Sequence, residues 1–266
     1  MSGQTIALVP TMGFFHEGHL KLMEVGKKHS DSLMISIFVN PIQFGPAEDL
    51  EEYPRDIEGD LSKAEKVGVD IVFVPSAKGM YPDSFQTRLN VERVTNFLCG
   101  LSRPGHFNGV TTVVAKLFNI IKPHLAIFGQ KDYQQLTVIS RMVTDMNMDI
   151  QIIGVPTVRE SDGLAMSSRN SYLSPEERKS AVCLKKSIDL ADDMLKSGER
   201  DVDRIKSEVK KLILSYPSTE IDYINICHPV TLEDLDKIES ETLLALAVGV
   251  GRTKLIDNGL IGQAVL

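Results

Sequence analysis

Short apolar runs alternate with amphipathic stretches through residues 1–160 of the chain. The runs have the length of buried strands, and the stretches between them repeat their apolar positions with the period of a helix. The predicted strands are residues 6–9, 33–39, 71–74, 125–128 and 150–155, and the predicted helices are residues 20–28, 60–67, 109–121 and 134–146. This alternation predicts an α/β fold, a Rossmann-like parallel sheet with helices on both faces.

The pattern changes in the last third of the chain. Ser174 and Glu177 have the spacing of a capping box, with a proline at the first helical position, and predict a helix that runs to about residue 196. A second amphipathic stretch, residues 202–213, precedes three strand-like segments. Two helices followed by strands predict a small α+β domain. We therefore expect a Rossmann-like domain over residues 1–173 and a C-terminal α+β domain over residues 174–266.

The composition is that of a globular protein, with 42% hydrophobic and 24% charged residues among 266. A formal net charge of −7 argues against a nucleic-acid-binding surface, because such surfaces carry a basic excess. The longest apolar runs, such as residues 243–250, are too short to span a bilayer. We expect neither a nucleic acid nor a membrane among the partners.

The three cysteines lie far apart in the sequence, at Cys99, Cys183 and Cys227. Their number is odd and they form no Cys-x-x-Cys pair, so neither a disulfide framework nor a structural zinc site is favoured. This cysteine usage fits a reducing compartment, and we expect a cytoplasmic protein.

The most informative segment, residues 6–19, is an apolar strand that breaks at a proline and a glycine and then places His16 and His19 at a helix start. A helix N-terminus presents unpaired N–H groups and a partial positive charge, and two imidazoles spaced i, i+3 add donors on the same side. Gly18 removes a side chain where a ribose or phosphate approaches the backbone. This arrangement predicts a site for nucleotide phosphates.

Zinc is an alternative ligand for this pair of histidines, since His-x-x-His on a helix also binds zinc and would point to a metallohydrolase. The nearby candidates His29 and Glu24 lack a recognisable ligand spacing, and the segment is not the His-Glu-x-x-His of metalloproteases. A chance match of four residues is the other alternative. Only the other segments of the chain can show whether the histidines form a phosphate site, a zinc site or a chance match.

Polar clusters follow three of the predicted strands. In parallel sheets ligands bind at the carboxyl ends of the strands, so clusters at these ends are expected to converge. The clusters are residues 10–19, 39–45 and 129–135. A further polar segment, residues 162–170, ends in two serine hydroxyls and an arginine, donors that suit a loop closing on a triphosphate. Taken alone, this segment is equally well an ordinary linker.

The combination of His-x-Gly-His at the first strand–helix junction with a Met-Ser-Ser-Arg loop resembles the nucleotidylyltransferase superfamily. Within it, nearly every segment resembles the pantoate-beta-alanine ligase family. The blocks that carry the resemblance are residues 10–13, 16–19, 38–45, 53–55, 103–107, 128–135, 162–170 and 255–258. The resemblance implies that ATP adenylates the carboxylate of pantoate, releasing pyrophosphate, and that the amine of β-alanine then displaces AMP. It also implies a homodimer.

The same resemblance assigns roles to individual residues. His16 and His19 would contact the ATP phosphates, His19 as donor to the leaving group, and Lys131 would neutralise phosphate charge. The implied catalytic set is His16, His19, Lys131, Ser167 and Arg169. The implied ATP-binding set adds Met12, Gly13, Gly18, Gly129, Gln130, Asp132, Val158, Met166 and Ser168. Asn40, Gln43 and Gln135 would bind pantoate and β-alanine, because neutral amides donate to carboxylates and pair with hydroxyls.

The resemblance also implies Mg²⁺. Family members have a pair of acidic residues after the Tyr-Pro-Arg segment, where this chain has Gly59 and Asp60. Asp60 is therefore the expected ligand, alone or replaced by Glu58, which matches the few protein ligands that Mg²⁺ takes. The alternative for Asp60 is the N-cap of the helix that begins there.

Other function classes remain as alternatives. A class I aminoacyl-tRNA synthetase shares the histidine and serine elements, but this chain lacks an anticodon-binding region and a basic surface. Another adenylyltransferase acting on a phosphorylated precursor would need cationic residues in place of Gln43 and Gln135. A non-catalytic ATP-binding module that kept the fold is the alternative from a different class.

Overall fold

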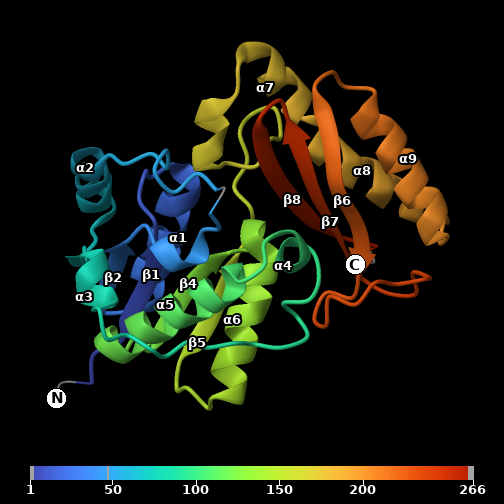
Figure 1. Cartoon of the computed structure of the whole chain (residues 1–266). Helices are drawn as coiled ribbons and strands as arrows, with labels where there is room; N and C mark the ends of the chain where they lie inside the picture. The colour runs from blue at the N-terminus through green and yellow to red at the C-terminus, as the bar shows by residue number, and fades with distance from the viewer. Residues whose placement is uncertain (1–2, 47, 263–266) are drawn as a thin grey trace. The chain divides into compact units, whose positions relative to one another are not determined.

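The computed structural model describes residues 3–46 and 48–262 (Figure 1). The chain divides into two compact units, Met1–Val158 and Arg159–Leu266, and each is described by itself. The division falls before the expected boundary at residues 173/174. The difference arises because Arg159 forms a β-bridge with Ala165 and an ion pair with Asp257, so the segment that begins at Arg159 belongs to the second unit.

The first unit is built on a five-stranded sheet with the order β3-β2-β1-β4-β5. All neighbouring strands are parallel, which confirms the predicted sheet. The strands are β1 (Ile6–Thr11), β2 (Ser32–Ile37), β3 (Ile71–Phe73), β4 (Leu125–Gly129) and β5 (Gln151–Val155). Because β1 lies between β2 and β4, the order reverses there, and the segments that follow these strands leave the sheet at the edge where parallel sheets of this kind generally bind ligands.

Helices cover both faces of this sheet. Ala7 and Val9 of β1 pack in one cluster with Met23 of α1, whereas Leu8 points to the opposite face, where α5 contacts β1. The helices of the unit are α1 (Glu17–His29), α2 (Ile57–Val67), α3 (Ala77–Met80), α4 (Cys99–Ser102), α5 (His106–Ile121) and α6 (Tyr133–Asp145), with short 3₁₀ turns η1 (Pro41–Gln43) and η2 (Gln130–Asp132). No helix of the described residues is both long and apolar enough to cross a membrane.

Strand β1 continues through Pro10, where the sequence predicts a break. Pro10 lacks an N–H group, but the strand still pairs with β2 in this register, Pro10 beside Ser36. The hydroxyl of Thr11 donates to the carbonyl oxygen of Ser36 at 2.6 Å and ties the end of β1 to its neighbour. The turn that leads to His16 therefore starts later than expected, after Thr11.

The second unit packs helices on a three-stranded antiparallel sheet of order β6-β7-β8, the predicted α+β unit. Helices α8 and α9 lie side by side, and their apolar faces share one core with β7 (Figure 1). Its elements are η3 (Ser168–Tyr172), α7 (Pro175–Ala181), α8 (Cys183–Lys196), α9 (Val202–Leu214), β6 (Thr219–Cys227), β7 (Thr242–Val250) and β8 (Thr253–Ile261).

The predicted capping box of Ser174 and Glu177 is present, but the helix it opens does not run unbroken to residue 196. It is interrupted at Val182, whose N–H bonds to the carbonyl oxygen of Ser180 instead of continuing the helical ladder. A β-branched residue, which is a weaker helix former, stands at the interruption. The result is two helices, α7 and α8, in place of one.

Candidate active site

Two histidines cap each other at the N-terminus of α1. His16 is the N-cap, and its Nδ1 accepts a hydrogen bond from the N–H of Gly18 at 3.2 Å. The backbone N–H of His16 donates to Nδ1 of His19 at 3.3 Å, which completes a capping box made of two imidazoles. An Nδ1 that accepts is unprotonated, so this network assigns the proton of neutral His19 to Nε2. The ring of His19 is thereby fixed as an Nε2–H donor.

The electrostatic surroundings keep His19 neutral. Burial, followed by the positive charges of His16, Lys131 and Lys63, lowers the pKa of His19 to about 3. Lys131 comes from the segment after β4 and the histidines from the segment after β1, so the structure brings these two polar clusters together. Several cationic groups around a neutral donor suit a polyanion, because its negative charge offsets their mutual repulsion.

A strained turn links β1 to the histidines. Gly13 has φ 86° and Phe14 has φ 55°, both in the left-handed region. A Cβ at Gly13 would lie 2.9 Å from Oδ2 of Asp60 and 3.1 Å from the side chain of Ile37, so glycine is required there for space as well as for φ.

Asp60 is buried beneath this turn, with 1% of its surface exposed. Its carboxylate accepts the N–H groups of Phe14 at 2.7 Å and Phe15 at 2.6 Å. It does not cap α2, because the N-cap of that helix is Asp56, whose side chain accepts from the N–H of Gly59. Both carboxylate oxygens of Asp60, the expected magnesium ligand, are therefore engaged by the backbone, and Glu58, the expected substitute, is exposed.

The cluster after β2 is held by amide hydrogen bonds. Asn40 is 1% exposed, and its Nδ2 donates to Oε1 of Gln43 at 3.0 Å and to the carbonyl oxygen of Gly109 at 3.1 Å. The hydroxyl of Tyr81 donates to Oδ1 of Asn40 at 2.8 Å. With its oxygen and its amide nitrogen engaged by the protein, Asn40 orients Gln43, whose Nε2 points to the sulfur of Met12 at 3.2 Å.

The cluster after β4 leads into α6. Its first turn carries Gln134, which is buried and donates to the carbonyl oxygens of Val94 and Phe97, and Gln135, which is only partly buried. The buried neighbour thus fixes the helix start that carries Gln135. Lys131 forms an ion pair with Asp132 at 3.7 Å in the preceding 3₁₀ turn.

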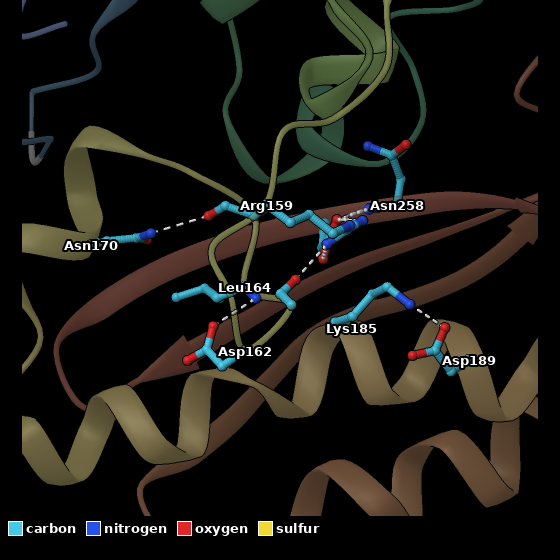
Figure 2. A network of polar contacts seen from close by, with 10 residues as sticks. Arg159, Asp162, Leu164, Asn170, Lys185, Asp189 and Asn258 are labelled. Carbon is cyan, nitrogen blue, oxygen red and sulfur yellow. Dashed lines mark hydrogen bonds and ion pairs between the residues drawn. The ribbon is translucent and has the colours of Figure 1, made fainter. Parts of the chain in front are cut away.

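The serine–arginine loop lies in the second unit. Ser167 caps η3, its hydroxyl accepting from the N–H of Arg169 at 3.3 Å, and Ser168 is buried. Asn170 donates to Oε1 of Glu160 at 2.8 Å, which ties the end of the loop to the segment that precedes it. Figure 2 labels Asn170 and shows a dashed line leaving its side chain.

A tight turn precedes that loop. Asp162 accepts from the N–H of Leu164 at 3.1 Å, and Gly163 has φ 94° (Figure 2). Arg178 pairs with both Glu160 and Asp162, so three charged side chains hold the turn against α7. No motif in the sequence indicates this network, because its members are joined only by the fold.

The remaining predicted residues follow their elements. Val158 ends the first unit, and Met166 lies in the second. The other predicted residues belong to the first unit and are close in sequence to residues described above: Met12, Gly13, Gly18, Gly129, Gln130 and Asp132. Two residues that support the site, Lys63 and Tyr81, were not predicted from the sequence. The charge of Lys63 helps to lower the pKa of His19, and the hydroxyl of Tyr81 donates to Asn40. Both residues are distant in sequence from their partners, and no motif around either one indicates the contact.

Known proteins resemble this chain over nearly its whole length. A family model described as Pantoate-beta-alanine ligase matches residues 1–260. A relative from Syntrophus aciditrophicus named Pantothenate synthetase is 59% identical over 262 residues, 98% of this chain and 92% of the relative. One of the same name from Geobacter sulfurreducens is 56% identical, covering 98% of this chain and 93% of the relative.

Solved structures of proteins with these names also resemble this chain. Pantothenate synthetase from Thermus thermophilus superimposes with a TM-score of 0.93 at 43% identity, covering 96% of this chain and 92% of that one. Pantoate-beta-alanine ligase from Francisella tularensis, complexed with beta-gamma ATP and beta-alanine, gives a TM-score of 0.81 at 33% identity, covering 98% and 91%. On these matches, the chain belongs to the pantoate-beta-alanine ligase family.

Proposed function

We propose that this chain condenses pantoate with β-alanine to form pantothenate, with cleavage of ATP to AMP and pyrophosphate. In the first step a carboxylate oxygen of pantoate attacks the α-phosphorus, an O–P bond forms and pyrophosphate leaves. In the second step the amine of β-alanine attacks the acyl carbon, a C–N bond forms, and AMP leaves with one former carboxylate oxygen while the amine loses a proton. The observation that carries this proposal is the family match over residues 1–260.

His19 acts in the first step as a neutral hydrogen-bond donor. Its Nε2–H is set by the capping box and needs no prior protonation, so the donor is present throughout the neutral pH range. A donor aimed at developing negative charge on the leaving pyrophosphate stabilises the transition state more than the ground state. His16 and Lys131 add donors and positive charge to the same site. No step needs an enzyme nucleophile.

The other assignments extend this proposal. Gln43 and Gln135 bind pantoate, with Asn40 holding the first of them in place. The triphosphate is bound by Ser167, Ser168 and Arg169. The adenylate and phosphate surroundings are completed by Met12, Gly13, Gly18, Gly129, Gln130, Asp132, Val158 and Met166. The protein acts in the cytoplasm as a homodimer.

The nucleotide enters as its magnesium complex, MgATP. The described residues contain no group of three or more histidine, cysteine, aspartate or glutamate side chains placed to hold a metal ion. Asp60 is buried and both of its oxygens accept backbone N–H groups, which does not fit a direct ligand to a hydrated Mg²⁺. In this proposal the phosphates of ATP carry Mg²⁺ into the site.

AMP release tests this function. The complete mixture contains ATP, Mg²⁺, pantoate and β-alanine, and matched mixtures lack one component each. AMP formation that requires all four components supports the ligase. Pyrophosphate exchange with pantoate but no AMP on adding β-alanine would leave another adenylyltransferase as the function. ATP binding without either reaction would favour the non-catalytic module.

A further inference from the structure

The segment between β1 and α1 needs external support. Phe14 holds a left-handed backbone at φ 55°, a conformation that is uncommon for a residue with a side chain and persists only where the surroundings enforce it. The next residue, Phe15, leads directly into the N-cap, His16, whose own N–H donates to His19. The path of this segment therefore sets where both imidazoles lie.

Asp60 supplies part of the support. Its two carboxylate oxygens accept separate backbone N–H groups, Oδ2 from Phe14 at 2.7 Å and Oδ1 from Phe15 at 2.6 Å. Hydrogen bonds to an ionised carboxylate are shorter and stronger than neutral ones, and these two leave consecutive peptide groups little freedom. Gly13 lies so close that even a methyl group there would meet Oδ2.

Lys63 completes the support from the same helix. It lies three residues after Asp60, on the same side of α2, and its Nζ donates to the carbonyl oxygen of Phe15 at 2.8 Å. Within the described residues Lys63 forms no ion pair with a carboxylate, and the carbonyl of Phe15 is its polar partner. Both backbone groups of Phe15 are thus held by two side chains of α2.

We propose that Asp60 and Lys63 are positioning residues that clamp Phe14 and Phe15 and thereby fix His16 and His19 for the phosphates of ATP. The clamp rests on the role proposed above for the two histidines. It assigns the buried carboxylate to the protein backbone and not to a metal ion. It also explains why α2, which follows β2 in the chain, matters to a site built at the end of β1.

Backbone amide signals test the clamp without substrate or metal. In the enzyme free of ATP and Mg²⁺, nitrogen-15 spectra should show strong protection of the Phe14 and Phe15 N–H groups. In Asp60→Asn the side-chain NH₂ faces a backbone donor, so at least one bond is lost and exchange of that amide should quicken by about tenfold or more. Unchanged amides in this variant would overturn the clamp.

The matched control is Asp56→Asn on the same helix. It removes the same charge but keeps a side chain that caps α2 equally well, so Phe14 and Phe15 should be unaffected. Magnesium chloride added to the nucleotide-free wild type should leave both amide signals in place. A magnesium-dependent shift that disappears in Asp60→Asn would instead make Asp60 a metal ligand.

Kinetics then separate positioning from bulk stability. Asp60→Asn and Lys63→Met should lower kcat for pyrophosphate exchange by roughly ten- to a hundredfold, the scale of a misplaced catalytic donor, with the magnesium requirement unchanged. Lys63→Gln keeps a donor without the charge, and should recover most of the loss if the bond to Phe15 is what matters. Equal loss in Lys63→Gln and Lys63→Met would overturn the role given to that bond. An inactive wild type with protected amides would instead refute the proposed function and leave the clamp standing.

Discussion

The backbone N–H of His16 donates to Nδ1 of His19 at 3.3 Å, and the two imidazole rings lie with their centroids 4.1 Å apart. One hydrogen bond thus closes the start of α1 and also selects the protonated nitrogen of His19. Under the proposed function, the bond that caps the helix also orients the donor for the ATP phosphates, so a change at either histidine should affect both.

Replacing His19 by alanine should cut adenylation of pantoate by roughly a hundred- to a thousandfold, the effect of removing one preorganised donor to developing charge. Pyrophosphate exchange measures this step alone. His29→Ala at the other end of α1 is the matched control and should exchange normally. Near-normal turnover in His19→Ala would remove His19 from the mechanism.

The depressed pKa of His19 predicts a pH-dependent contribution to stability. An unfolded histidine takes up a proton near pH 6.5, whereas the folded ring resists protonation down to about pH 3. Acid therefore favours the unfolded state, and the stability present above pH 6.5 is lost progressively as pH falls towards 3, by at most about 1.4 kcal/mol per pH unit. Urea unfolding at several pH values should show this slope in the wild type and a shallower one in His19→Asn. Parallel slopes would mean that His19 titrates normally.

Gln135→Ala and Gln43→Ala should raise the KM for pantoate more than the KM for ATP. Each removes an amide that is proposed to pair with the carboxylate or hydroxyls of pantoate, and neither is assigned to a phosphate. Initial rates with one substrate varied at a time distinguish the two effects. Gln151→Ala, an exposed amide at the start of β5, serves as control. A larger effect on ATP would mean that the two pockets have been exchanged.

Gly13→Ala should destabilise the protein by about 1–3 kcal/mol, because it adds a side chain in a left-handed conformation. The clash with Asp60 adds to this cost. Gly105→Ala separates the two effects, since Gly105 has φ 83° but no atom within 4 Å of the added methyl group. Thermal unfolding should therefore show a larger loss at Gly13. Equal losses of stability in the two variants would mean that the turn at Gly13 rearranges and avoids the clash with Asp60.

In the second unit, Arg159→Met should destabilise the protein by about 3–5 kcal/mol, because it leaves the carboxylate of Asp257 buried without its partner. Asp257 is 2% exposed and accepts two bonds from this guanidinium. A double variant, Arg159→Met with Asp257→Leu, should recover much of the loss. Additive losses in the double-mutant cycle would show that the two residues stabilise the unit independently.

Much of the fold could be predicted from the sequence because its signals are local. The apolar runs of β1 and β4 and the Ser174–Glu177 capping box are each contained within a few residues. Continuation of β1 through Pro10 was not predicted, because it depends on pairing with Ser36 across the sheet. The interruption at Val182 likewise has no strong local marker.

The same distinction between local patterns and long-range contacts holds for the residues of the candidate site. The histidine pair is recognisable by its spacing at a strand–helix junction, and Lys131 lies near enough for its charge to help lower the pKa of His19. The contacts of Asp60 and Lys63 with Phe14 and Phe15 join segments that are distant in the chain, and no local pattern encodes them. The groups proposed to meet the substrate were therefore predictable from the sequence, and Asp60 was singled out as a magnesium ligand, but the backbone contacts of Asp60 and Lys63 were not predicted.

The most direct test of the account is isotope transfer from pantoate. Pantoate labelled with oxygen-18 in its carboxylate is incubated with the enzyme, MgATP and β-alanine, and the products are analysed by mass spectrometry. Attack of the carboxylate on the α-phosphorus predicts one labelled oxygen in AMP and one in the amide carbonyl of pantothenate. Label in pyrophosphate or inorganic phosphate, or AMP without label, would contradict the pantoyl-adenylate mechanism.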